Sequence, residues 1–198
     1  MRTGEAAVAD VAGTEHLLQL FDSESSRADA VAEFVRDGLA AGDALLLVVA
    51  PEHWKRIAAQ LPGAEIDAAI ADGRLTVREA AATLRAFMHR GVPDAERFEA
   101  SVGTLVRHVS SRGRRLRVYG EMVDVLATEG DFDAAGELET LWNQLAARHP
   151  FTLLCGYSAV SFGDPRSARA LRDLCSAHSH VLSSPEDMLG SFLLGTYR

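Results

Sequence analysis

The chain has 198 residues, 47% of them hydrophobic, and a formal net charge of −8, and this length suits a single domain with one buried core. The negative charge disfavours nucleic-acid binding, because proteins that bind nucleic acid present a basic face to phosphate, and no apolar run approaches the roughly 20 residues of a membrane span. Residues 1–13 lack the apolar core of a signal peptide, so we expect a cytoplasmic protein whose two cysteines stay reduced.

The first unit expected along the chain is strand, helix, strand, over residues 16–50. The runs HLLQLFD and DALLLVVA are short and rich in Leu and Val, as in strands that are covered on both faces. Ser26 followed by Asp29 resembles a capping box, Gly42 is a natural stop, and Arg27 is placed off the apolar stripe. The helix between the strands is indicated by four apolar residues at helical spacing: Val31, Phe34, Val35 and Leu39.

The turn of this unit is where a nucleotide-binding protein would keep its phosphate loop. It reads DSESSRAD, with no glycine and no lysine. A phosphate cradle needs glycines for the close approach of backbone N–H groups and a lysine for the outer phosphates. Asp22 and Glu24 would instead repel a polyphosphate. We therefore predict that the chain neither binds nor hydrolyses ATP.

Four further strands are expected, and helices separate them. The expected strands are RLTVREA, RLRVYG, FTLLCGY and HVL, the first of them near a sheet edge because charged residues interrupt it. The expected helices are PEHWKRIAAQL, AEIDAAIADG, AATLRAFMHRG, the stretch 93–109, EMVDVLATEG, FDAAGELETLWNQLAARH and RSARALRDLCSAH. This alternation predicts a single α/β domain with a mostly parallel sheet of five to six strands flanked by helices.

Six blocks in this order resemble the MEDS family of sensory domains: HLLQLFD, FVRDGLAAGD, RVYGEMVDVL, LETLWNQL, FTLLCGY and CSAHSHV. The resemblance covers roughly residues 14–182, between a flexible N-terminal segment (1–13) and a tail (183–198) that is expected to be helical. It implies a RecA/KaiC-like fold with a degenerate phosphate loop. A tryptophan is expected after MVDVL in such proteins, and Ala127 stands there instead, which would enlarge a pocket or remove a packing contact.

The same resemblance implies a function in bacterial signal transduction. Such a domain would bind a small molecule, for example a simple hydrocarbon derivative, and would have no catalytic activity. Relatives are often fused to a histidine kinase or a DNA-binding output, so this chain is expected to relay its signal in trans to a histidine kinase or a transcription regulator. A homodimer is a further expected arrangement.

The expected ligand site lies where strands end. Glu121 and Asp124 directly follow the strand RLRVYG, and ligands of parallel sheets bind at the carboxyl ends of the strands. Two acidic residues in a first helical turn also complement the helix dipole, which is the alternative explanation. Gly120 would let a ligand approach closely. The predicted pocket residues are Asp22, Ser23, His53, Glu121, Asp124 and Tyr157.

The metal-ligating residue types gather late in the chain. Cys155, Cys175, His178 and His180 could in principle form a zinc site. However, Cys175 continues an apolar helical stripe, and C-x-x-H-x-H lacks the spacing of a known zinc finger. His16, which opens the first strand, is interpreted as a packed or solvated residue. We therefore predict no bound metal and no cofactor.

Two alternatives to a sensory domain stay open at this stage. The first is a metal-dependent hydrolase that combines Glu121 and Asp124 with the Cys/His cluster. The second is a protein-interaction scaffold without a ligand.

Overall fold

The computed structural model describes residues 14–110, 113–164 and 167–182, so the predictions for 1–13 and for the tail 183–198 lie outside the described residues. Within them, six parallel strands form one sheet in the order β3-β2-β6-β7-β1-β8. The strands are β1 (His16–Phe21), β2 (Ala44–Val49), β3 (Leu75–Glu79), β6 (Leu116–Gly120), β7 (Thr152–Ser158) and β8 (His180–Leu182). All six strand predictions are confirmed, including the edge position of β3, and with them the α/β fold class.

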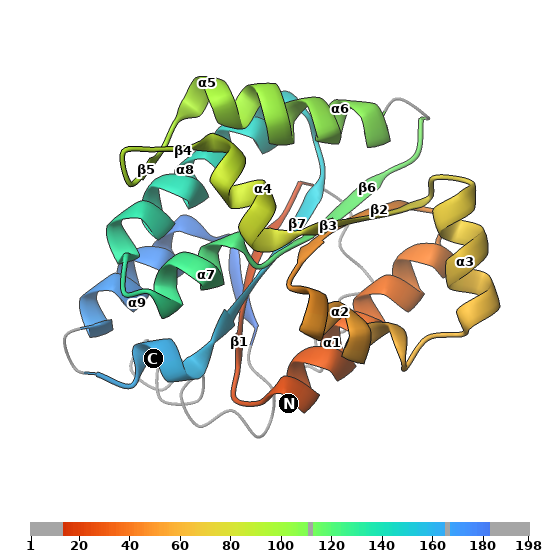
Figure 1. Cartoon of the computed structure of the whole chain (residues 1–198), viewed down its shortest axis with the longest axis horizontal. Helices are drawn as coiled ribbons and strands as arrows, with labels where there is room; N and C mark the ends of the chain where they lie inside the picture. The colour runs from red at the N-terminus through yellow and green to blue at the C-terminus, as the bar shows by residue number, and fades with distance from the viewer. Residues whose placement is uncertain (1–13, 111–112, 165–166, 183–198) are drawn as a thin grey trace, which may run out of the picture.

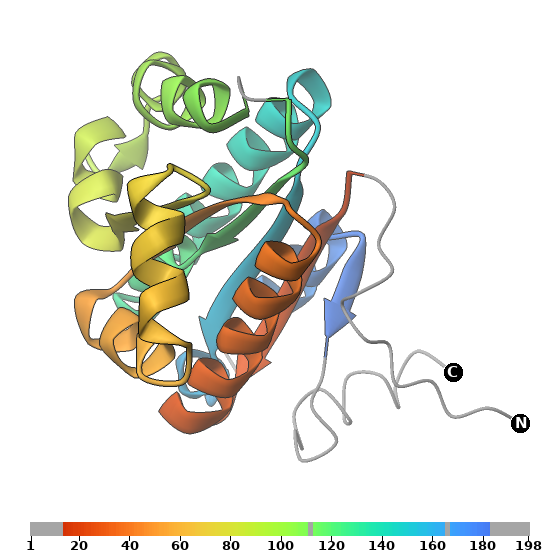
Figure 2. The same cartoon turned by 90° about the vertical axis from the view of Figure 1, so that its right-hand side faces the viewer.

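Helices cover both faces of the sheet (Figures 1 and 2). One face is covered by α1 (Glu24–Ala40), α2 (Pro51–Ala58) and α3 (Gly63–Ala71). The other is covered by α4 (Ala80–Phe87), α5 (Ala95–Phe98), the π-helical segment η2 (Glu99–Gly103), α6 (Thr104–Ser110), α7 (Met122–Thr128), α8 (Phe132–Arg148), the 3-10 segment η3 (Ala159–Phe162) and α9 (Ala168–Ala177). Within the described residues, no helix combines the length and the apolar character needed to cross a bilayer.

The strands divide their side chains between two cores. In β2, Leu45 and Leu47 pack toward α1, while Leu46 packs on the opposite face, which α4 and α6 cover, as the two-residue period of a strand requires. Every residue of β2 is buried, which explains its unbroken apolar sequence. On the α8 side, the Trp142 ring meets the rings of Phe98 and Phe151 edge-on.

Several predicted helices differ in detail from the structure: α2 ends at Ala58, and the stretch 93–109 is divided into α5, η2 and α6. The capping box of α1 is formed by Ser23 and Ser26, not by Ser26 and Asp29. Helix α4 ends at Phe87 rather than at Gly91, because the next residues form a two-stranded hairpin of β4 (Met88–His89) and β5 (Val92–Pro93). Its turn needs positive φ angles, 53° at Arg90 and 85° at Gly91.

The parallel arrangement brings the carboxyl ends of β1, β2, β6 and β7 to one edge of the sheet, the lower edge in Figure 1. The residues that follow these strands are Asp22, Ala50, Glu121 and Ala159, each at the start of a connection to a helix or 3-10 segment. This edge therefore collects backbone N–H groups and acidic side chains from distant parts of the sequence.

One glycine in β7 lets the aromatic side chains beside it pack. A Cβ atom at Gly156 would lie 2.6 Å from the Tyr119 hydroxyl and 2.9 Å from Phe21 Cε2, both in buried side chains. We expect Gly156→Ala to lower the free energy of unfolding by about 1–3 kcal/mol, because the core has no room for the methyl group. Guanidinium denaturation measures this change.

The matched control is Gly136→Ala in α8, where a Cβ atom meets nothing within 4 Å. There the alanine should raise stability by about 0.5–1 kcal/mol, because glycine is unfavourable inside a helix. Equal effects of the two substitutions would contradict the packing assigned to Gly156.

Candidate functional site

A buried arginine is the centre of the carboxyl-edge site. Arg27 in α1 is 2% exposed, its Nη2 donates to Asp124 Oδ2 at 2.8 Å, and its Nη1 lies 3.4 Å from Glu121 Oε1. Its guanidinium also lies over the ring of Phe21, 5.0 Å from the centroid. The prediction that Arg27 lies off the apolar stripe is wrong: it precedes Val31 by one helical turn and shares the buried face.

Glu121 joins three elements at this edge. Its Oε2 accepts hydrogen bonds from the Ala50 N–H at 2.8 Å and from His53 Nδ1 at 2.7 Å. Its Oε1 accepts from the Tyr119 hydroxyl at 2.7 Å. Glu121 occupies the N-cap position of α7, yet its side chain accepts no capping hydrogen bond within the described residues. Its carboxylate therefore holds the ends of β2 and β6 and the start of α2 together instead of capping its own helix.

Asp124 connects the same network to β7. Its Oδ1 accepts from the Ser158 N–H at 2.7 Å, while its Oδ2 accepts from Arg27. The two carboxylates that the sequence places three residues apart thus share one guanidinium. Each also binds a backbone N–H at the end of a different strand.

Burial and neighbouring charges shift the pKa values of Glu121 and Asp124 in opposite directions. Burial alone would raise the pKa of Glu121, but the hydrogen bond from His53 and the charge of Arg27 outweigh it, so the pKa lies below its ordinary value. Burial is the stronger effect at Asp124 and raises its pKa despite Arg27. The hydrogen bond to Glu121 raises the pKa of His53. The site therefore holds one firmly ionised carboxylate and one that accepts a proton more readily.

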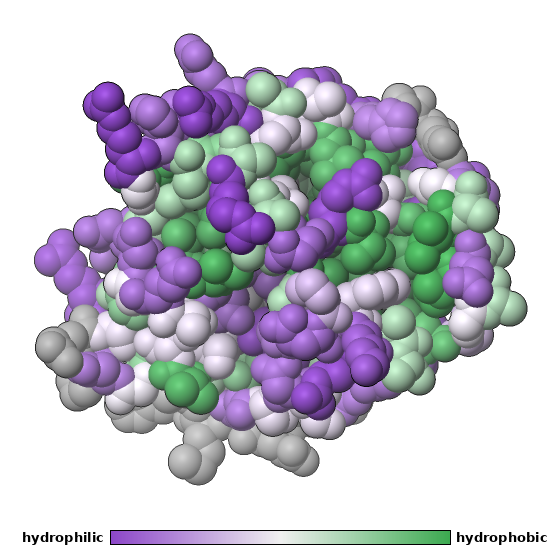
Figure 3. Space-filling view, viewed as in Figure 1, coloured by the Kyte–Doolittle hydropathy of each residue, from purple (hydrophilic) through white to green (hydrophobic). Residues whose placement is uncertain are grey.

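These groups line a depression of about 380 Å³. Its lining in the described part of the chain is Glu24, Arg27, Ala50, Glu52, His53, Glu121, Asp124, Val125, Thr128, Glu129 and Ser158. Polar surface gathers over α2 at the lower centre of Figure 3, and less polar surface lies to its left. A second depression of about 570 Å³ adjoins the first at Thr128 and Ser158, and Ala127 contributes to its wall.

The structure brings together three of the six predicted pocket residues. His53, Glu121 and Asp124 line the first depression. The Ser23 hydroxyl is engaged in capping α1, and Asp22 lies exposed just before it. The Tyr157 hydroxyl donates to Glu139 at 2.5 Å, on the α8 side of the sheet. Ligand binding by His53, Glu121 and Asp124 stays a prediction. Tyr157 does not line this depression, so its place in the predicted pocket is wrong.

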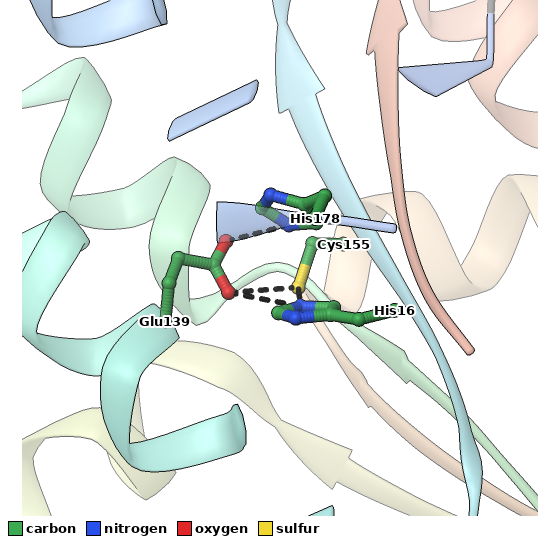
Figure 4. A group of neighbouring side chains, drawn as sticks. All are labelled: His16, Glu139, Cys155 and His178. Carbon is green, nitrogen blue, oxygen red and sulfur yellow. Dashed lines mark hydrogen bonds and ion pairs between the residues drawn. The ribbon is translucent and has the colours of Figure 1, made fainter. Parts of the chain in front are cut away.

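A second buried polar cluster lies on the α8 side, and Figure 4 shows its four members. His16 Nε2 is 3.1 Å from Glu139 Oε2 and 3.3 Å from Cys155 Sγ, and His178 Nε2 is 3.2 Å from Glu139 Oε1. Burial would raise the pKa of Glu139, but the two imidazoles outweigh it and hold the carboxylate ionised. Burial and the neighbouring carboxylate raise the pKa of the Cys155 thiol.

Sequence reasoning found half of this cluster and missed the rest. The predicted candidates Cys155 and His178 belong to the cluster, while Cys175 and His180 lie outside it. His16 could have been found from strand geometry, because Leu18 pairs with Cys155 and His16 shares the face of Leu18. Glu139 could also have been found from the sequence, because it is a charged residue on the buried face of α8 beside Leu138 and Trp142.

The protein is thus a single α/β domain in which the buried hydrogen-bond network around Arg27 holds polar groups at one edge of the sheet. The family model of MEDS, described as "MEthanogen/methylotroph, DcmR Sensory domain", matches residues 15–179. The chain therefore belongs to the MEDS family of sensory domains, which confirms the resemblance seen in the sequence. A comparison with curated proteins finds no match.

Replacement of the buried Arg27 should lower the free energy of unfolding. Arg27→Met leaves Glu121 and Asp124 buried without their shared partner, and we expect a loss of about 3–5 kcal/mol in the free energy of unfolding. Adding Glu121→Gln and Asp124→Asn to this variant should restore part of the loss, because the uncompensated charges are then gone. Chemical denaturation of the single and triple variants measures both effects.

Arg115→Met is the matched control. Arg115 pairs with Asp43, but its side chain is 44% exposed, and Asp43 keeps its partner Arg117. An exposed pair is worth about 0–1 kcal/mol. A loss in Arg27→Met no larger than that in Arg115→Met would contradict the central place of Arg27.

His53 should make stability depend on pH. Its folded pKa lies above the unfolded value of about 6.5, so its contribution is fully present below pH 6.5 and is lost as pH rises through the folded pKa. The stability difference between wild type and His53→Gln should therefore shrink from about pH 6 toward pH 8. In a Glu121→Gln background the difference should change less with pH, because the remaining partner is Glu24, whose Oε2 lies 2.8 Å from His53 Nε2. The same pH slope in both backgrounds would show that Glu121 is not the partner responsible.

Proposed function

We propose that this sensory domain binds a small, weakly polar molecule in the carboxyl-edge depression and acts in signal transduction without catalysing a reaction. The observation that carries the proposal is the network around Arg27. It joins the start of α1, the junctions of β2 with α2 and of β6 with α7, and the end of β7 beneath one depression. A molecule bound there would contact elements from four parts of the chain.

The charges of the depression favour a neutral or cationic ligand. The described lining contains five carboxylates against Arg27 and His53, and the guanidinium is already engaged by Glu121 and Asp124. An anion would be repelled by the lining and would have to compete for Arg27. The supported ligand class is therefore small alcohols, amines and comparable hydrocarbon derivatives, within a volume of about 380 Å³.

The network also supplies a route for a conformational response. A ligand that hydrogen-bonds to Asp124 would compete with the Ser158 N–H or with Arg27 for the same oxygens. Either loss would loosen α7 from β7 or from α1. A ligand with different affinities for the two arrangements shifts their populations, and a histidine kinase or transcription regulator in trans would detect the difference.

The placement of the two groups disfavours the hydrolase alternative. It requires Glu121 and Asp124 to act together with the Cys/His cluster. The two carboxylates lie at the sheet edge around Arg27, whereas the cluster packs against α8, on the face of the sheet opposite α1. Among the described residues, the group with metal-ligand spacing contains neither Glu121 nor Asp124. The two groups are separate sites.

Ligand binding should depend on the edge carboxylates more than folding does. Native mass spectrometry of the purified protein identifies a co-purifying molecule, and a panel of small neutral and cationic compounds extends the search. We expect Glu121→Gln and Asp124→Asn each to weaken binding of the identified compound by more than about tenfold, or 1.4 kcal/mol, in a calorimetric titration.

Asp43→Asn is the matched control, because Asp43 is also a buried carboxylate paired with arginine, but it precedes β2 at the opposite edge of the sheet. It should lower stability and leave affinity unchanged. Unchanged affinity in Glu121→Gln and Asp124→Asn together with a lower melting temperature would assign both residues a structural role alone.

ATP should not bind. The Ser23 side chain already accepts from the Ser26 N–H at the start of α1, the turn has neither glycine nor lysine, and Glu24 adds negative charge. Calorimetry with ATP and magnesium should show no heat of binding at micromolar protein. Micromolar affinity would contradict the assignment of a degenerate phosphate loop.

A further inference from the structure

The cluster on the α8 side has the composition of a metal site. His16 opens β1, Glu139 lies in α8, Cys155 lies in β7, and His178 caps the end of α9. Their ligand atoms (two imidazole nitrogens, one carboxylate oxygen and one thiol sulfur) all lie within 4.8 Å of one another. Nitrogen, sulfur and carboxylate oxygen are the donors that Zn²⁺ takes in four-coordinate sites.

Both imidazoles are held with the ligating nitrogen pointing inward. Asn143 Nδ2 donates to the Ala177 carbonyl at 3.0 Å, so Asn143 Oδ1 faces His16 and accepts from its Nδ1 at 2.9 Å. His178 Nδ1 donates to the Leu174 carbonyl at 2.7 Å. A neutral ring with its proton on Nδ1 carries its free lone pair on Nε2, and outer hydrogen bonds of this kind orient histidine ligands in metal sites.

One of these inward nitrogens lacks a hydrogen bond. Within the described residues, His178 Nε2 is buried and has no hydrogen-bond partner, although Glu139 Oε1 lies 3.2 Å away. The side chain of His178 is fully buried. A buried polar atom without a partner is costly, and a cation between the two groups would satisfy it.

The spacing of the donors suits a tetrahedral ion. Bond lengths of about 2.0–2.3 Å to a tetrahedral Zn²⁺ place neighbouring donor atoms roughly 3.2–3.6 Å apart. The cluster shows 3.1 Å and 3.3 Å from His16 to Glu139 and Cys155, 3.4 Å between Cys155 and Glu139, and 3.2 Å from His178 to Glu139. Small side-chain movements would complete the coordination.

We propose that His16, Glu139, Cys155 and His178 bind one Zn²⁺-class divalent cation in a closed, four-coordinate site, separate from the carboxyl-edge depression. Binding would displace the thiol proton of Cys155 to solvent, because thiolate is the ligating form. The ion would join β1, β7 and α8 to the junction of α9 with β8. The competing explanation is a cluster stabilised by protons alone, in which the histidines serve only as partners of Glu139.

Cobalt distinguishes these explanations, because tetrahedral Co²⁺ shows visible d–d absorption and a thiolate ligand adds a near-ultraviolet charge-transfer band. Protein stripped with a chelator under reducing conditions is titrated with Co²⁺ and then with Zn²⁺, and bound metal is counted by elemental analysis. We expect one Co²⁺ per chain with both spectral features, and their loss when Zn²⁺ displaces it. Folded wild-type protein without the charge-transfer band would overturn the proposal.

The chain offers a matched control for each key ligand. Cys155→Ser should abolish the charge-transfer band, while Cys175→Ser should keep it. His178→Gln should weaken Co²⁺ binding more than tenfold, while His180→Gln, at an exposed position, should not. Circular dichroism of each variant checks folding, and if Cys155→Ser does not fold, the wild-type spectrum and the His178 and His180 variants decide. Binding that survives Cys155→Ser and His178→Gln, or that is lost in a control variant, would contradict the site.

Discussion

The arrangement of the carboxyl edge depends on one buried cation. Arg27 brings a full charge into a place where it is 2% exposed, and burial of an unpaired charge would be prohibitive. Its partners Glu121 and Asp124 come from a segment almost a hundred residues away. Each carboxylate also accepts a backbone N–H from a strand end. The charge balance of this one group therefore fixes how α1, α2, α7 and β7 meet.

The sheet separates two polar interiors and also connects them. Arg27 and Tyr119 belong to the α1 side, while Glu139 and Cys155 belong to the α8 side. Strand β7 contributes to both, because Cys155 and Tyr157 contact Glu139 and the next residue, Ser158, donates its N–H to Asp124. A change in the carboxyl-edge site therefore acts on a strand whose preceding residues are held by the second cluster.

The fold was predictable from sequence because apolar periodicity reports burial directly. The runs HLLQLF, ALLLVV and TLLCGY are buried over nearly their whole length, and α8 follows its apolar stripe through Leu138 and Trp142. The sites were less predictable because they consist of charged residues on buried faces. Arg27 and Glu139 both occupy apolar-stripe positions, and a pattern that assigns charge to solvent misplaces both.

The alternatives for Glu121 and Asp124 could not be separated by sequence either. Acidic residues in a first helical turn have an electrostatic reason to be there, and the distinguishing facts are contacts with Ala50, His53 and Ser158 that no local pattern contains. Tyr157 shows the same limit, since a strand-terminal tyrosine can turn its hydroxyl to either face and here it meets Glu139.

Hydrogen–deuterium exchange with and without the bound small molecule tests the central claim, that a ligand acts on the elements joined by Arg27. The account predicts that amide exchange rates change at the start of α1, at residues 50–53, in α7 and at residues 157–159, where the ligand competes for the oxygens of Asp124, with little change in α3. Changes confined to other segments, with these four unchanged, would contradict it.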